Sequence, residues 1–99
     1  MRNRIGIFLR SIAMPKRSPD WPRVRHEHLK HNPFCWECGN DKDLEVHHIL
    51  PFHLFPEKEL DPTNLLTLCE SLFLNCHLKI GHLGNWKNYN ASLLRMASL

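Results

Sequence analysis

The sequence has no apolar run long enough to cross a membrane, because its longest apolar stretches fall far short of the ~20 residues that a spanning helix needs. It has no internal repeat and no low-complexity tract, which excludes repeat architectures. The start of the chain is basic, but Arg10 interrupts it too early for a secretory signal, and no small-residue cleavage pattern follows. We therefore expect an intracellular, cytoplasmic protein with no membrane partner. A transit peptide is the alternative interpretation of the Arg-rich start.

Acidic residues are missing from the first 17 positions, which form a predicted basic arm. Residues 1–30 contain eight Arg or Lys and two acids, whereas residues 31–99 contain five and eight. A basic arm on a nearly neutral body predicts a polyanionic partner, most simply DNA, although a solvated tail would have the same composition. The candidate DNA-binding residues of the arm are Arg2, Arg4, Arg10, Lys16 and Arg17. The composition fits a monomer and a dimer equally well.

The remaining residues, 18–99, are few enough for one domain. Pattern and breaker residues predict a small α+β fold. In chain order we expect a helix that starts after Ser18-Pro19-Asp20 and ends at Asn32-Pro33, strands over 44–49 and 65–68, a helix over 73–80 stopped by Gly81, and a short helix around 93–96.

Four cysteines in an intracellular chain indicate a metal site rather than disulfides. Cys35 and Cys38 have the spacing of a zinc knuckle, and Gly39 lets the turn close. Cys69 and Cys76 form a wider pair that can converge on the same ion. A redox CxxC and four unrelated buried thiols are the alternatives, but a redox motif needs a βαβ unit, which this chain lacks. Four thiolates would leave no open position, so this zinc would be structural.

Three further segments carry histidine and asparagine in order: EVHHILP (45–51), LDPTNLLTLC (60–69) and NCHLKIGH (75–82). Neighbours in a strand point to opposite faces, so His47 and His48 can share a site only where the strand ends, and Pro51 predicts such an end. With the CxxC pair, these segments resemble the zinc-bound branch of the HNH endonuclease family. The resemblance covers residues 33–82, and its ordered combination is more specific than any single piece.

The resemblance implies a ββα-metal core, in which a β-hairpin and a helix hold a divalent ion, with flanking helices and the four-cysteine zinc site outside it. Carried over, His48 is the general base, Asn64 orients that base, and His47 and His77 are metal ligands. The chain departs from the family pattern L-C-x-x-C-H, because four extra residues separate Cys69 from Cys76. His82 follows His77 by five residues, and a third ligand, a substrate contact and a structural role all fit it.

The predicted function is that of a metal-dependent DNA endonuclease that makes nicks. Imidazole ligands favour Mn²⁺ over Mg²⁺ as the catalytic ion, and Ni²⁺ or Co²⁺ would also bind, beside a structural Zn²⁺. Two alternatives come from other classes: a zinc-stapled DNA-binding module that does not cut, and a redox or zinc-storage protein. Among other residues, Asp61 is expected in an Asx turn with Thr63, and Glu45 as an outward charge partner.

Overall fold

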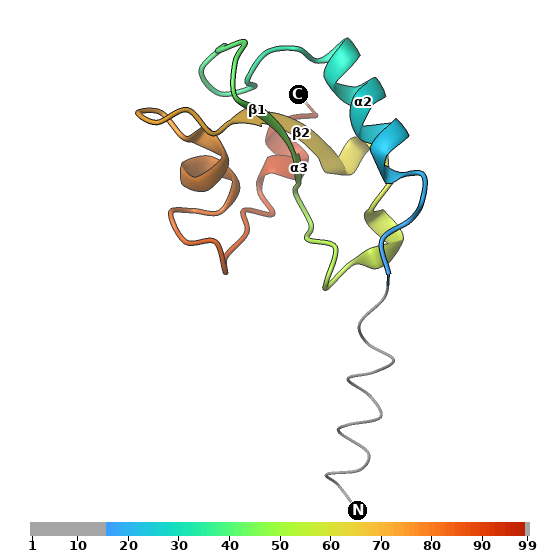
Figure 1. Ribbon diagram of the computed structural model, residues 1–99. Helices are drawn as coiled ribbons and strands as arrows, with labels where there is room; N and C mark the ends of the chain where they lie inside the picture. Colours follow the sequence, from blue (N-terminus) through green and yellow to red (C-terminus); the bar gives the residue numbers. More distant parts are fainter. Residues whose placement is uncertain (1–15, 99) are drawn as a thin grey trace, which may run out of the picture.

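The computed structural model describes residues 16–98, which form an antiparallel hairpin with helical segments around it (Figure 1). The elements in chain order are α2 (Trp21–His31), β1 (Leu44–His48), the short 3₁₀ turns η1 (Pro56–Lys58) and η2 (Pro62–Asn64), β2 (Leu65–Cys69), the π-helix η3 (His77–Gly81) and α3 (Leu93–Met96). Arg2, Arg4 and Arg10 lie outside the described residues, so the basic arm stays a prediction. Within residues 16–98, none of the helices has the length and apolarity to span a bilayer.

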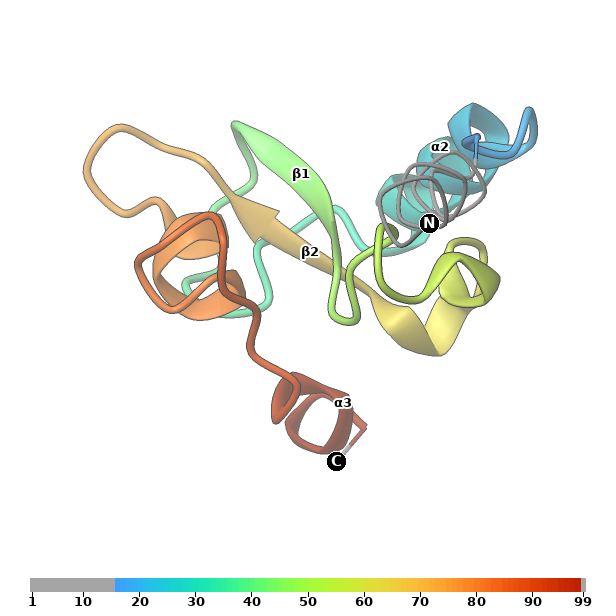
Figure 2. The same cartoon turned by 90° about the horizontal axis from the view of Figure 1, so that it is seen from below.

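The hairpin pairs β1 with β2 in the register that sets His47 opposite Leu66 and His48 opposite Leu65. All five residues of β2 are buried, because helical segments cover both of its sides. Figure 2 shows α2 and η3 on opposite sides of the hairpin. A continuous apolar run such as Leu-Leu-Thr-Leu-Cys suits a strand covered in this way. Its one hydroxyl, on Thr67, is satisfied by donating to the Asn32 carbonyl at 2.8 Å.

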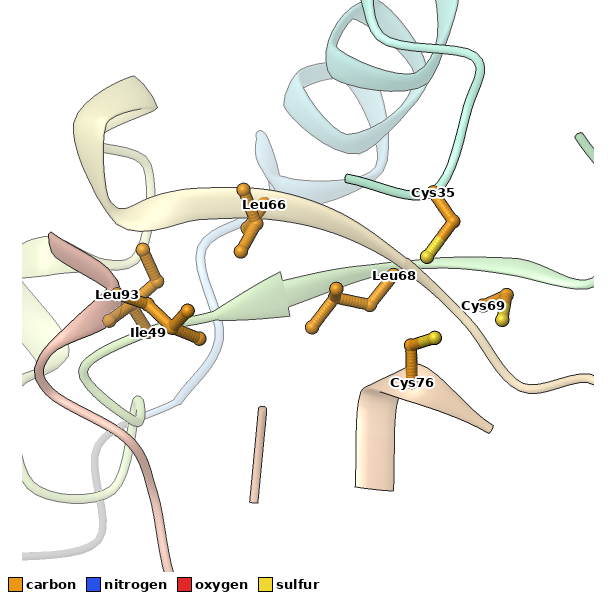
Figure 3. Close-up of a cluster of buried hydrophobic side chains, with 7 residues drawn as sticks. All are labelled: Cys35, Ile49, Leu66, Leu68, Cys69, Cys76 and Leu93. Atoms are coloured by element: carbon orange, nitrogen blue, oxygen red, sulfur yellow. The ribbon is translucent and has the colours of Figure 1, made fainter. Parts of the chain in front are cut away.

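The core is a single cluster with an apolar end and a sulfur end (Figure 3). Ile49, Leu68 and Leu93 are fully buried, and together with Leu66 they fill the space between the hairpin and α3. Cys35, Cys69 and Cys76 are also buried and gather at the other end of the cluster, where their sulfur atoms face a common point. The thiols therefore close the core of a small domain, a position in which a structural metal adds stability.

The helix expected over 73–80 is wrong at its start. Residues 72–74 form a turn, and a five-residue π-helix begins at His77. Leu72 and Phe73 are exposed, so the apolar side chains of this stretch do not pack on the domain, and Asn75 takes a left-handed conformation with φ of 38° that interrupts a regular helix. The strands lie where the sequence predicts them, with β1 one residue shorter and β2 one residue longer.

Two local expectations are confirmed in the loops and on the sheet. The Asp61 carboxylate accepts from the backbone N–H of Thr63 at 2.9 Å and from its hydroxyl at 2.7 Å, which is the predicted Asx turn. Glu45 faces outward and pairs with Arg25 on α2 at 3.2 Å. The Asx turn begins η2 directly before β2, so it fixes the place where the second strand starts.

Candidate active site

The first cysteine pair lies in a tight turn between α2 and β1. The Gly39 N–H donates to the Cys35 carbonyl at 2.9 Å, and Gly39 has a φ of 80°, which a side chain would strain. The Trp36 N–H donates to the Thr67 carbonyl at 2.8 Å and so ties the turn to β2. The predicted knuckle is therefore formed by backbone bonds and is held beside the strand that carries Cys69.

The second pair reaches the same point by way of the exposed turn at residues 70–75. The Sγ atoms of the four cysteines all lie within 4.8 Å of one another, and those of Cys38 and Cys69 are 3.7 Å apart. A tetrahedral zinc with Zn–S bonds of about 2.3 Å needs sulfurs about 3.8 Å apart. The four extra residues between Cys69 and Cys76 do not prevent convergence, since they bulge outward.

Electrostatics in the sulfur cluster favour a thiolate at Cys69. Burial opposes its ionisation, but backbone N–H groups of Cys76 and Ser71 donate to the sulfur and lower the pKa of Cys69 to about 6. Burial and the neighbouring thiols raise the pKa of Cys76. Four close thiols cannot all ionise without a cation, so this donor set fits a zinc ion that would neutralise them.

A second cluster consists of three histidines at the junction of the hairpin and η3. His47 extends from β1, His77 begins η3, and His82 follows it, and one ring nitrogen of each lies within 4.8 Å of the others. His77 Nε2 is 3.1 Å from His47 Nδ1. The other nitrogen of His47, Nε2, is buried and has no hydrogen-bond partner among the described residues. Three ring nitrogens that lie this close together, on rings of which one also has a buried nitrogen without a partner, fit a divalent ion bound by all three histidines.

Partners outside the cluster fix the orientation of two of these rings. Glu70 Oε2 accepts from His77 Nδ1 at 2.8 Å, and the Asn88 carbonyl accepts from His82 Nδ1 at 2.7 Å. Each bond assigns the proton to Nδ1 and leaves the lone pair of Nε2 for a metal. Sequence reasoning missed Glu70, because residues seven apart in a regular helix are separated by about two turns and do not touch; the outward turn at 70–75 brings Glu70 and His77 together.

Burial keeps two histidines of the cluster in the form that a metal ligand requires. His47 is 2% exposed. Burial, with the charges of His77, His82 and His48 adding to it, lowers the pKa of His47 to about 3. Burial also lowers the pKa of His82. Both rings are therefore neutral at pH 7, and a neutral imidazole is the ligand form.

Gly81 lets the backbone of η3 approach the His47 ring. A Cβ atom at this position would lie 3.0–3.1 Å from three atoms of that ring, which is too close without a shift. The sequence predicts Gly81 as the residue that stops the helix, and η3 ends at this residue, although Gly81 is not among the glycines with positive φ. Its absent side chain instead gives His47 room beside His77 and His82.

His48 lies on the other side of β1 from His47. Its ring packs on Trp21 of α2 with centroids 4.4 Å apart, and the Glu59 carbonyl accepts from its Nε2 at 2.9 Å. This bond leaves the lone pair on Nδ1, and burial lowers the pKa of His48, so the neutral ring can accept a proton. Because β1 ends at His48, both neighbours still line one cavity of about 350 Å³.

Asn64 is buried at the end of η2, directly before β2, and makes no hydrogen bond to the His48 ring. Its amide oxygen accepts from the Leu50 N–H at 2.8 Å, and its amide nitrogen donates to the carbonyls of Leu50 and Lys58, each at 3.1 Å. Asn64 therefore holds both ends of the loop that presents the Glu59 carbonyl to His48. Any effect on the orientation of the base would act through that loop.

The cavity joins the three-histidine cluster to His48 and opens to solvent. Beyond these four histidines, its walls include a fifth, His53, together with Arg17, Phe52, Trp86 and Tyr89. Trp86 is 53% exposed, and its ring lies 5.1 Å from the ring of His77 and 4.9 Å from that of His82. The exposure of Trp86 argues against a role in the core.

Residues 35–83 match the family model described as HNH endonuclease. The chain carries an HNH domain. The match starts at Cys35 and ends one residue after His82, so it includes both cysteine pairs, the histidine cluster, His48 and Asn64. No match to the chain was found among curated proteins or among solved structures. The resemblance read from the sequence is thus confirmed, and an HNH domain indicates a nuclease-type function that involves nucleic acid and divalent metal.

The cysteine cluster leads to a prediction about zinc content. After a mild chelator wash, the HNH domain is expected to retain one zinc per chain, measured by elemental analysis. The Cys69→Ser variant should lose the ion and unfold by circular dichroism, because structural zinc supplies folding free energy. The His82→Ala variant should keep its zinc. A folded wild-type chain without zinc would contradict the assignment.

A second prediction concerns Glu70, which accepts from His77. Removing a partner of this kind costs about 10- to 100-fold in metal affinity, so Glu70→Ala should weaken Mn²⁺ or Ni²⁺ binding to the histidine cluster by that factor. Glu70→Gln keeps an acceptor and should fall between it and wild type. The exposed Glu57, on η1, supplies the control Glu57→Gln. Calorimetric titration that gives equal affinities for Glu70→Ala and wild type would exclude this role.

Proposed function

We propose that this HNH domain is a metal-dependent DNA endonuclease that hydrolyses phosphodiester bonds with His48 as general base. The observation that carries the proposal is that His48 and the three-histidine cluster line the same open cavity, from opposite sides of β1. A base and a metal site that face one space are the two parts that this hydrolysis requires. A protein that only bound DNA would need neither.

His47, His77 and His82 would hold the catalytic ion. When bound, it would act as a Lewis acid that offsets negative charge on the phosphate oxygens. The ring orientations set by Glu70 and Asn88 direct lone pairs toward the cluster, and Gly81 gives His47 the space to join it. With three protein ligands, positions remain for water and phosphate, in contrast to the closed set of four thiolates.

His48 would take the proton of the attacking water on Nδ1, while the Glu59 carbonyl holds Nε2–H and the ring direction. The water oxygen forms a new bond to phosphorus as one ester P–O bond breaks. One strand end then carries a phosphate monoester, and the other carries a hydroxyl after the leaving oxygen gains a proton. Asn64 contributes by fixing the loop that contains Glu59.

The cysteine cluster and the basic arm complete the proposal. A zinc held by Cys35, Cys38, Cys69 and Cys76 would be structural, and free thiols of this kind suit an intracellular compartment. DNA is the proposed substrate because it presents phosphates to the basic arm and to the cavity. The proposed contacts of the arm are Arg2, Arg4, Arg10, Lys16 and Arg17.

The role of the base is tested by His48→Ala. Loss of a general base costs about 10²–10⁴ in rate, so conversion of supercoiled plasmid should fall by that factor while DNA binding in a gel shift persists. His26, exposed on α2 and away from the cavity, gives the matched control His26→Ala. If the His48→Ala variant cleaves at the wild-type rate, His48 is not part of the mechanism. If the wild-type protein gives a gel shift but no cleavage, a DNA-binding module is favoured.

The ligand set predicts the metal preference and the first product. Imidazole nitrogen suits Mn²⁺, Ni²⁺ and Co²⁺ better than Mg²⁺, which prefers oxygen ligands, so Mn²⁺ should support faster cleavage than Mg²⁺. One base and one ion cut one strand per encounter, and nicked circles should therefore appear before linear DNA. The measurement is a time course on supercoiled plasmid with metal-stripped enzyme and each ion in turn.

Two results would contradict this prediction separately. Equal or faster cleavage with Mg²⁺ at matched concentration would argue against the three histidines as the ligand set. Linear product without a nicked intermediate would instead argue for two sites acting together, as in a dimer.

A further inference from the structure

Glu59 is a buried acid that the motifs do not include. It is 4% exposed and lies in the loop between the strands. Its Oε1 accepts from the Ser18 N–H at 3.0 Å, and its Oε2 has no hydrogen bond among the described residues but lies 3.5 Å from Arg17 Nη1. A buried carboxylate is costly unless a cation is near, so Glu59 draws the segment before α2 onto the loop.

The pairing with Glu59 holds Arg17 in place but engages only part of its guanidinium group. Its guanidinium lies over the Phe52 ring at 4.4 Å, and its side chain is 51% exposed. A guanidinium has five N–H donors in a planar fork, and Glu59 faces only one edge of it. The same side chain lines the cavity that contains His47 and His48. A fixed cation with free donors therefore faces the space in which the reaction would occur.

We propose that Arg17 binds the phosphate that is cleaved, and that Glu59 is a positioning residue for both Arg17 and His48. The inference rests on the proposed nuclease function. Glu59 is suited to this role because its carboxylate holds Arg17 and its backbone carbonyl accepts from His48 Nε2 at 2.9 Å. A guanidinium matches two phosphate oxygens at once, and a preorganised cation stabilises the charge that develops during attack. Arg17 thus differs from the rest of the basic arm, which would add affinity.

The competing explanation is that Arg17 only neutralises Glu59. Four variants of the full chain separate the two: Arg17→Ala, Arg17→Lys, Glu59→Gln and the double variant Arg17→Ala/Glu59→Gln. Lysine keeps the ion pair but loses the planar fork, so it protects the test against a folding defect. Arg23 pairs with Asp20 at 3.8 Å on α2 and is outside the cavity, which makes Arg23→Ala the matched control.

The first measurement is steady-state cleavage of a duplex oligonucleotide in Mn²⁺. Loss of one preorganised donor costs about 10²–10³ in kcat, so Arg17→Ala should lose that factor with a smaller change in KM, and Arg17→Lys should lose part of it. The double variant should stay as slow as Arg17→Ala. Glu59→Gln alone should lower kcat less, and Arg23→Ala should match wild type.

The second measurement is binding of the same labelled duplex without metal, as a function of salt. One lost phosphate contact lowers the slope of log affinity against log salt by about 0.9, and this is expected for Arg17→Ala but not for Arg23→Ala. Full activity in Arg17→Lys, or recovery in the double variant, would show that Arg17 only neutralises Glu59 and would overturn the inference. A fully active Arg17→Ala beside an active wild type rejects the inference alone. A wild type that fails to cleave the duplex with every divalent ion rejects it together with the nuclease function.

Discussion

Cys76 and His77 are adjacent in the chain, and this adjacency connects the two metal clusters. Cys76 is drawn into the sulfur end of the core beside Cys35 and Cys69, so the next residue has little freedom in where it begins η3. His77 is thereby carried to 3.1 Å from His47. A zinc that closed the sulfur cluster would therefore also fix the geometry of the histidine cluster, although it would take no part in the chemistry.

The neighbouring histidines of β1 depend on the same construction. The pleat sends His47 toward η3 and His48 toward α2, where Trp21 and the Glu59 carbonyl receive it. Because β1 stops at His48, the two rings can still line one space. Neighbouring residues of a strand normally cannot share a site, and here the end of the strand removes this obstacle without a bulge.

The sequence was most informative where local chemistry decides the structure. The two strands, the Asx turn at Asp61 and the turn from Cys35 to Gly39 follow from patterns that a few adjacent residues determine. It was least informative where a side-chain contact depends on how loops fold, as for Glu70 with His77 or Glu59 with Arg17. An acidic residue in a loop can pair with many different partners, and the sequence alone does not say with which. The helix expected over 73–80 failed because Leu72 and Phe73 are exposed and Asn75 has a positive φ, so η3 begins only at His77.

The two clusters also differ in the ions that they can bind, although they are connected through the adjacent residues Cys76 and His77. Four thiolates are soft, carry much negative charge and fill every tetrahedral position, which selects zinc and excludes substrate. Three imidazoles that bind an ion add no negative charge of their own and leave positions open, so charge at that site must come from the ion and from its surroundings. Glu70 adds negative charge behind one ligand, and Arg17 adds positive charge across the cavity. An anionic substrate would therefore meet more positive charge when the ion is bound than when Arg17 is the only cation in the cavity, and cleavage would then depend on metal twice: through the fold and through the charge of the site.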